Sequence, residues 1–83
     1  MTLSPHAAHA RDSRLAYLRF ILGDTPGALA LMKISVAEGT EAQLPSENLA
    51  WLYFELGEFY TQTGDAASAD TAYVTALSIH PGD

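Results

Sequence analysis

Residues 50–81 read AWLYFELGEFYTQTGDAASADTAYVTALSIHP, and this stretch decides the fold. Apolar side chains recur at helical spacing on both sides of Gly64-Asp65, a pair that is typical of a tight turn between two helices. The stretch therefore predicts a hairpin of two antiparallel helices, at about 47–62 and 66–79. Because a single hairpin cannot bury its apolar surface alone, we expect it to pack against a second unit.

The sequence before this hairpin repeats its organisation. A Gly-Asp pair at 23–24 lies 41 residues before the pair at 64–65, and it separates two further segments of helical spacing, at about 5–22 and 25–37. The sequence therefore predicts an all-α fold in which two tandem antiparallel helix-turn-helix hairpins form one domain over residues 1–83.

Capping signals set the expected ends of these helices. Ser4-Pro5 is typical of a cap followed by proline at the first helical position. Either Asp24 or Thr25 is expected to cap the second helix. The polar segment 39–46 lacks periodicity, so we expect a loop that ends at Ser46 as the cap of the third helix.

Two of the four helices have a distinctive apolar pattern. In the first helix, Leu15, Leu18 and Leu22 form an apolar stripe with Phe20 and Ile21, and we expect this stripe to face the core. The third helix is apolar around most of its circumference. Such a helix must touch neighbours on more than one side or offer a binding face.

The composition argues against several classes of function. The chain has no cysteine, so it has no disulfide framework and no nucleophilic thiol. Ten acidic residues oppose four basic ones, giving a formal charge of −6, which does not suit nucleic acid or an anionic membrane surface as a partner. We also expect no cofactor and no enzymatic activity, because the chain lacks a Gly-rich phosphate loop, a nucleophile-elbow serine and a His-Glu metal motif.

The charge is divided unevenly along the chain. Residues 1–36 hold all four cations and two acids, a charge of +2, whereas residues 37–83 hold eight acids and no cation, a charge of −8. This division allows a head-to-tail attraction between molecules or a basic ligand lying against the acidic half, and the alternative is that the acids only solvate the surface.

Targeting and metal signals are weak. No apolar run has the length of a membrane-spanning helix and the first ten residues lack a secretory pattern, so a cytoplasmic location is the default expectation. His6, His9 and Asp12 fall at i, i+3 and i+6 and could seat a divalent cation, although simple exposure to solvent is the favoured interpretation.

The second hairpin closely resembles a tetratricopeptide repeat, and the chain as a whole resembles the multi-repeat tetratricopeptide proteins of bacteria or a fragment of one. The well-matched repeat covers residues 50–83, and a degenerate copy covers about 9–42, with a period of 41 residues where about 34 is typical. In the second repeat the signature positions are occupied by Tyr53, Leu56, Gly57, Tyr60, Gly64, Ala69, Tyr73, Ala76 and Pro81. The first copy matches at Leu15, Ala16, Gly23, Asp24 and Ala28 but departs from the pattern at Asp12, Arg19, Met32 and Thr40.

The resemblance implies a non-enzymatic scaffold: a right-handed solenoid whose first helices line a groove for a peptide or a partner helix. On the third helix, the positions that correspond to the groove are Trp51, Phe54, Glu55, Glu58 and Gln62. On the first helix they are Ala10, Ser13, Arg14, Tyr17 and Ile21.

These groove positions suit an apolar segment that bears a lysine or arginine, because aromatic anchors stand beside carboxylates. Trp51 and Phe54 could instead pack against the first helix or the long loop. For Arg14, an ion pair with Glu55 is favoured over contact with a ligand carboxylate. The lysine and asparagine clamp of the co-chaperone members of the family is missing, so we do not expect a chaperone-tail adaptor.

A structural role is the alternative function. Repeat arrays generally need three or more units and a polar capping helix, so the last helix is expected to expose surface that another repeat or another molecule covers. The chain is therefore expected to belong to a longer array or to form a homo-oligomer. The residues expected to mediate self-association are Ala69, Ala72, Tyr73, Ala76 and Leu77.

Overall fold

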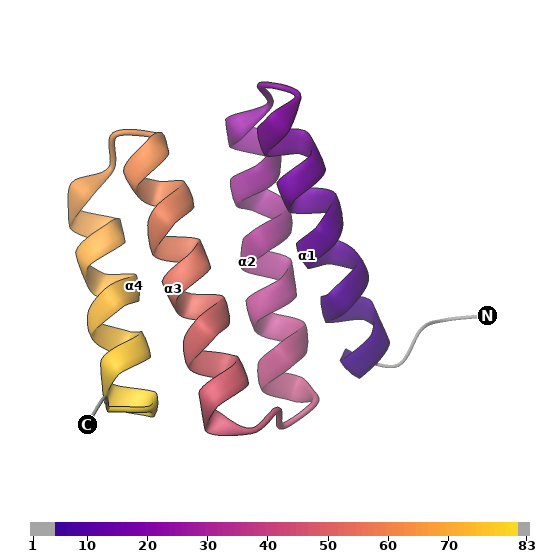
Figure 1. The fold of residues 1–83 in the computed structure, drawn as a ribbon, viewed down its shortest axis with the longest axis vertical. Coiled ribbons are helices and arrows are strands. Elements are labelled where there is room, and N and C mark those ends of the chain that lie inside the picture. Colours follow the sequence, from indigo (N-terminus) through magenta and orange to yellow (C-terminus); the bar gives the residue numbers. More distant parts are fainter. Residues whose placement is uncertain (1–4, 82–83) are drawn as a thin grey trace.

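The chain folds into four antiparallel helices that lie side by side (Figure 1). The computed structural model describes residues 5–81, with side chains from residue 8 onward. The helices are α1 (Pro5–Ile21), α2 (Thr25–Glu41), α3 (Ser46–Gln62) and α4 (Ala66–Ile79). Together they form a flat body of 38 × 34 × 16 Å, and within the described residues none of the four helices combines the length and apolar character needed to cross a membrane. The predicted all-α fold is confirmed.

The 41-residue period of the sequence is also a period of the structure. Helices α1 and α3 both have 17 residues, and their first and last residues differ by 41. Gly23 and Gly64 end these two helices with φ angles of 90° and 81°, in the left-handed region where a side chain is disfavoured. Asp24 and Asp65 then cap α2 and α4, each carboxylate accepting a hydrogen bond from the backbone N–H three residues later, at 3.0 and 3.1 Å.

The end of α2 differs from the prediction. This helix continues to Glu41 instead of ending near 37, and only residues 42–45 connect it to α3. Gly39, which the sequence assigned to the loop, lies buried inside the helix, and a Cβ atom there would be 2.8 Å from Cδ1 of Leu52. Glycine normally disfavours a helix, but at this position the missing side chain allows α2 and α3 to pack close together.

The cap of α3 also differs from the prediction. Ser46 is the first residue of the helix, and the capping position belongs to Pro45, whose side chain makes no capping hydrogen bond. The Oγ atom of Ser46 instead lies 3.4 Å from Nδ1 of His80, near the end of α4. Ser4, the expected first cap, lies outside the described residues.

The core lies on both sides of α2, which packs against α1 and α3, whereas α4 packs against α3. Small side chains allow the close approach within each hairpin: Ala16 and Ala28 are fully buried in the first, and Gly57 faces the ring of Tyr73 in the second. The buried cluster consists of Ala16, Ala28, Met32, Val36, Leu44, Leu52, Leu56, Phe59 and Ala72.

The predicted apolar stripe of α1 is covered in part: Phe20 packs against the core cluster, but the leucines of the stripe do not. Leu15 and Leu18 are 41% and 51% exposed, and Leu22 is more exposed still. The buried positions of α1 are instead Ala8, Asp12 and Ala16. Because α2 approaches α1 closely, small side chains occupy the contact and the leucines point away from it.

A candidate binding groove between the first helices of the two hairpins

A groove of about 530 Å³ separates the N-terminal halves of α1 and α3. Outside the groove the two helices touch through aromatic side chains, because the centroid of the Phe59 ring lies 5.2 Å from those of both Tyr17 and Phe20. The lining residues are His9, Ala10, Ser13 and Arg14 from α1, and Glu47, Asn48, Trp51, Leu52 and Glu55 from α3. The lining of the groove therefore comes from the first helix of each hairpin.

Trp51 forms the exposed wall of the groove. Its side chain is 59% exposed, and its ring stacks on Phe54 with centroids 5.3 Å apart and planes inclined by 21°. Phe54 in turn lies 5.5 Å from the ring of Tyr73 on α4. The stacked rings thus extend from Trp51 toward α4. Phe54 does not line the groove.

Glu55 lines the groove, whereas Tyr17 does not. Glu55 is buried, and its carboxylate interacts with the Tyr17 hydroxyl of α1. Burial raises the pKa of Glu55, and the nearby charge of Glu58 acts in the same direction, whereas the Tyr17 hydroxyl opposes the shift. The pKa of Tyr17 is raised above its ordinary value by its own burial and by Glu55. This carboxylate therefore has a partner within the chain.

The expected ion pair between Arg14 and Glu55 is not formed. Both residues line the groove, but the ion pairs of the described residues join Arg11 to Asp12 and Arg19 to Asp24, each at 3.0 Å. The Tyr17 hydroxyl takes the place that the guanidinium was expected to fill beside Glu55. Arg14 is exposed and makes no ion pair within the part of the chain that the structure describes.

The remaining predicted groove residues lie elsewhere. Glu58, Gln62 and Ile21 are exposed and do not line the groove. Sequence reasoning missed Glu47 and Asn48, which line the groove at positions i−4 and i−3 from Trp51. These residues could have been found by extending the groove-facing stripe of α3 by one turn toward its N-terminus.

The predicted self-association residues divide into two groups. Ala69, Ala72 and Ala76 are buried, because they face α3 within the hairpin and its core. Tyr73 is partly buried, and Leu77 is 62% exposed. Three of the five predicted residues therefore have little surface left for another molecule, which corrects the prediction.

The proposed metal ligands cannot be compared as a set, because the His6 side chain lies outside the described residues. Asp12 is buried and accepts a hydrogen bond from Nε of Arg11 at 3.0 Å. Its carboxylate also interacts with Glu38 of α2. Among the residues with described side chains, no cluster of three or more His, Cys, Asp or Glu is placed to hold a metal ion.

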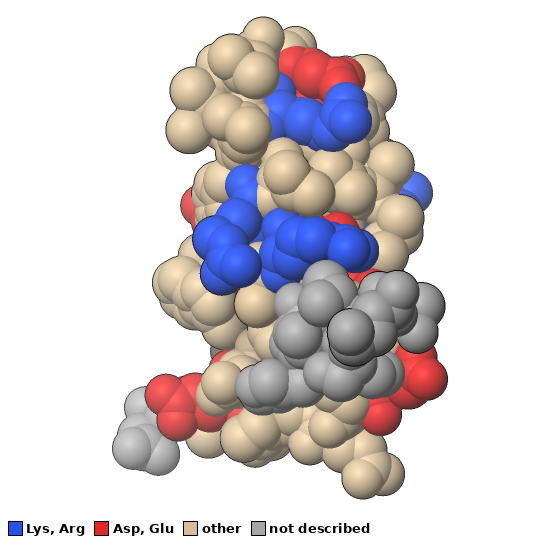
Figure 2. Space-filling view, turned by 90° about the vertical axis from the view of Figure 1, so that its right-hand side faces the viewer, with Lys and Arg blue, Asp and Glu red and all other residues tan. Residues whose placement is uncertain are grey.

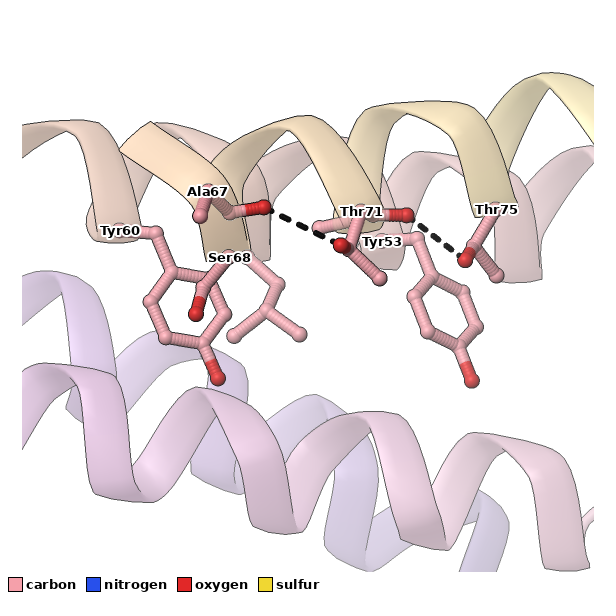
Figure 3. Close-up of a pocket in the computed structure, with 8 residues that line it drawn as sticks. Tyr53, Tyr60, Ala67, Ser68, Thr71 and Thr75 are labelled. Atoms are coloured by element: carbon pink, nitrogen blue, oxygen red, sulfur yellow. Dashed lines mark hydrogen bonds between the residues drawn. The ribbon is translucent and has the colours of Figure 1, made fainter. Parts of the chain in front are cut away.

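A second hollow, of about 300 Å³, lies on the other side of α3 (Figure 3). The Tyr53 and Tyr60 side chains extend from α3 toward α2, and Nζ of Lys33 lies 5.3 Å from the centroid of the Tyr60 ring. The Thr71 and Thr75 hydroxyls donate to carbonyl oxygens of their own helix at 3.1 and 2.8 Å. Both tyrosines are partly buried against the core cluster, so the hollow is explained by the packing of the helices.

Comparison with known proteins adds no relative: neither a family model, nor a curated protein, nor a solved structure matches this chain.

Proposed function

We propose that this chain is a tetratricopeptide-like protein-interaction module, without enzymatic activity, that binds a peptide or a partner helix in the groove between α1 and α3. The observation that supports it best is an exposed tryptophan at the edge of a groove that also contains an arginine without an ion pair. Tryptophan and arginine are the residues that most often dominate binding energy at protein interfaces.

The charges of the groove favour a ligand with an apolar residue and a lysine or arginine. The apolar residue would pack on the exposed face of Trp51, and the cation would meet the α3 wall, which carries carboxylates and no cation. Because Glu55 is buried and interacts with Tyr17, whereas Glu47 is exposed, Glu47 is the carboxylate available to the ligand. Arg14 on the opposite wall would hold an acidic residue or the backbone carbonyl groups of the ligand.

The test is a pull-down from native lysate followed by titration of the captured segment. Trp51→Ala is the groove variant, and Ile34→Ala is the matched control, because Ile34 is an exposed apolar residue of α2 that does not line the groove. Loss of a tryptophan anchor is expected to weaken binding by at least about 30-fold, corresponding to about 2 kcal/mol. Equal affinity of both variants would contradict the proposal.

The tryptophan also provides a direct probe of the groove. The chain contains a single tryptophan, so its fluorescence reports on one position, at the edge of the groove. A ligand that covers the ring is expected to shift the emission to shorter wavelength and to protect it from a soluble quencher. A ligand that binds with unchanged Trp51 emission and quenching would be bound at another surface.

A further inference from the structure

The exposed leucines of α1 occupy positions that are buried in α3. Leu15 and Leu18 stand 41 residues before Leu56 and Phe59, which are 7% and 2% exposed. Leu56 and Phe59 are buried because α3 packs against the preceding hairpin. We call Arg14, Leu15 and Leu18 the α1 face; it has the same helical positions as the buried side of α3, and its two leucines are 41% and 51% exposed.

The outer side of the second hairpin has the complementary property. Met32 and Val36 of α2 are buried in the cluster that α3 completes. Their equivalents 41 residues later are Tyr73 and Leu77, and Leu77 is 62% exposed. We call Glu58, Tyr73 and Leu77 the α4 face. This face resembles the surface of the first hairpin that receives α3.

The polar and charged residues at the two faces are also related by the shift of 41 residues. Within the chain, the Tyr17 hydroxyl of the first hairpin interacts with the Glu55 carboxylate of the second. The residue 41 positions after Tyr17 is Glu58, and the residue 41 positions before Glu55 is Arg14. A contact between the α4 face of one molecule and the α1 face of another would therefore replace this Tyr–Glu interaction by an ion pair.

The distribution of charge supports such a contact over a longer range. Figure 2 shows Lys and Arg side chains gathered on the side of the molecule that α1 forms. The second hairpin contains acids and no cation, because all four cations lie before residue 34. Faces of opposite charge attract each other, and they disfavour contacts between two identical faces.

We infer that the α1 face of one molecule binds the α4 face of a second copy, so that the contact between the two hairpins of one chain is repeated between chains. The two faces are different, which makes the contact heterologous. Each copy bound in this way leaves one α1 face and one α4 face free at the ends. Successive copies therefore extend the row of helices, and the mean mass is expected to increase steadily with concentration.

The first test separates the two faces. Leu18→Glu damages only the α1 face, and Leu77→Glu damages only the α4 face; both residues are exposed, so the fold is expected to tolerate the change. Light scattering is expected to show each variant alone at the monomer mass of 8.9 kDa, and an equimolar mixture at twice that mass without larger species. Circular dichroism and thermal unfolding establish that both variants are folded.

Three results would overturn the inference. The first is a wild-type chain that stays monomeric at several hundred micromolar. The second is self-association of either variant alone at the wild-type level, which would indicate contact between two like faces. The third is a mixture of the two folded variants that stays monomeric.

A charge exchange tests the predicted ion pair. Arg14→Glu and Glu58→Arg are each expected to weaken self-association, because like charges then face each other across the contact. The double variant, with both changes in one chain, is expected to restore it. If the double variant does not recover self-association, the pairing of Arg14 with Glu58 across the contact is contradicted. Arg14 also lines the groove, but Leu18 does not. Leu18→Glu is therefore expected to lose self-association and keep groove binding, and Trp51→Ala is the variant that tests the groove.

Discussion

The ring of Tyr73 lies across Gly57, so that a Cβ atom at Gly57 would be 2.6 Å from Cε1 of the tyrosine. Real Cβ atoms do not approach a ring carbon so closely, so α3 and α4 can keep this separation only with glycine at this position. The tyrosine hydroxyl also lies 3.4 Å from Oγ1 of Thr61, which further orients the ring. This contact sets how closely α3 and α4 approach each other.

Gly57→Ala is expected to destabilise the chain by overpacking. The cost is expected to be about 1–3 kcal/mol in the free energy of unfolding, measured by urea denaturation. In a Tyr73→Leu background the same change is expected to cost much less, because the ring that meets the new methyl group is missing. Equal costs in both backgrounds would show that the ring does not limit the approach of the helices.

Gln43→Gly is expected to stabilise the chain. Gln43 follows the end of α2 and has a φ angle of 54°, in the left-handed region that glycine occupies after α1 and α3. Removing the side chain relieves the left-handed strain, which outweighs the entropy of glycine in the unfolded chain, and the gain is expected to be about 1 kcal/mol. Gln43→Ala is the matched control, because it keeps the Cβ atom and is expected to give no gain.

Asp65→Ala is expected to lower the melting temperature at pH 7. The Asp65 carboxylate accepts hydrogen bonds at the start of α4, and these bonds hold its pKa below the ordinary value. Since the pKa is lowered by folding, the stabilisation is present above the unfolded pKa of about 3.9 and is lost as the pH falls through the folded pKa. Asp70→Ala, on the exposed side of the same helix, is expected to change little. A loss that is independent of pH would exclude capping as its cause.

Two carboxyl groups meet between α1 and α2. The Arg11 hydrogen bond lowers the pKa of Asp12, whereas burial and the neighbouring Asp12 carboxyl raise the pKa of Glu38. Asp12 therefore stays ionised while Glu38 tends to keep its proton. Because the folded pKa of Glu38 is raised, its contribution to stability is present at low pH and is lost as the pH increases above about 4.3, where the unfolded chain ionises.

Glu38→Gln is accordingly expected to increase stability at neutral pH, since the amide imitates the protonated acid without an ionisable group. At pH 4 the variant and the wild type are expected to unfold at nearly the same temperature, and the advantage of the variant is expected to grow with pH. Thermal unfolding across this pH range measures the difference. Glu41→Gln, an exposed acid near the end of the same helix, serves as the control. A constant difference at every pH would contradict a raised pKa for Glu38.

The turns explain why the helix order could be predicted. Gly23-Asp24 and Gly64-Asp65 each combine a left-handed helix end with a carboxylate cap, and both functions are local properties of the residues involved. The end of α2 has no such signal. Gln43 adopts the glycine conformation there, and Gly39 lies inside a helix, so the local rules gave an early end.

The candidate groove was predicted in part for the same reason. Periodicity along a single helix places Trp51 and Glu55 on one face, and in the structure both line one hollow together with Arg14. Periodicity does not state which neighbour a side chain meets. For this reason the sequence did not predict that Glu55 interacts with the Tyr17 hydroxyl instead of with Arg14.

The sequence by itself determined four helices, two Gly-Asp turns and a period of 41 residues, because turns, caps and helical periodicity depend on residues close together in the chain. Only the tertiary structure decided which side of each helix is covered. Ala16 is buried against α2 while Leu15 and Leu18 face outward, because the close approach of two helices selects small side chains at the contact. Three alanines of α4 are covered by the same packing, and Leu77 is left exposed. Hydrophobicity alone predicts that a leucine is buried, but the distance between the packed helices decides whether it is.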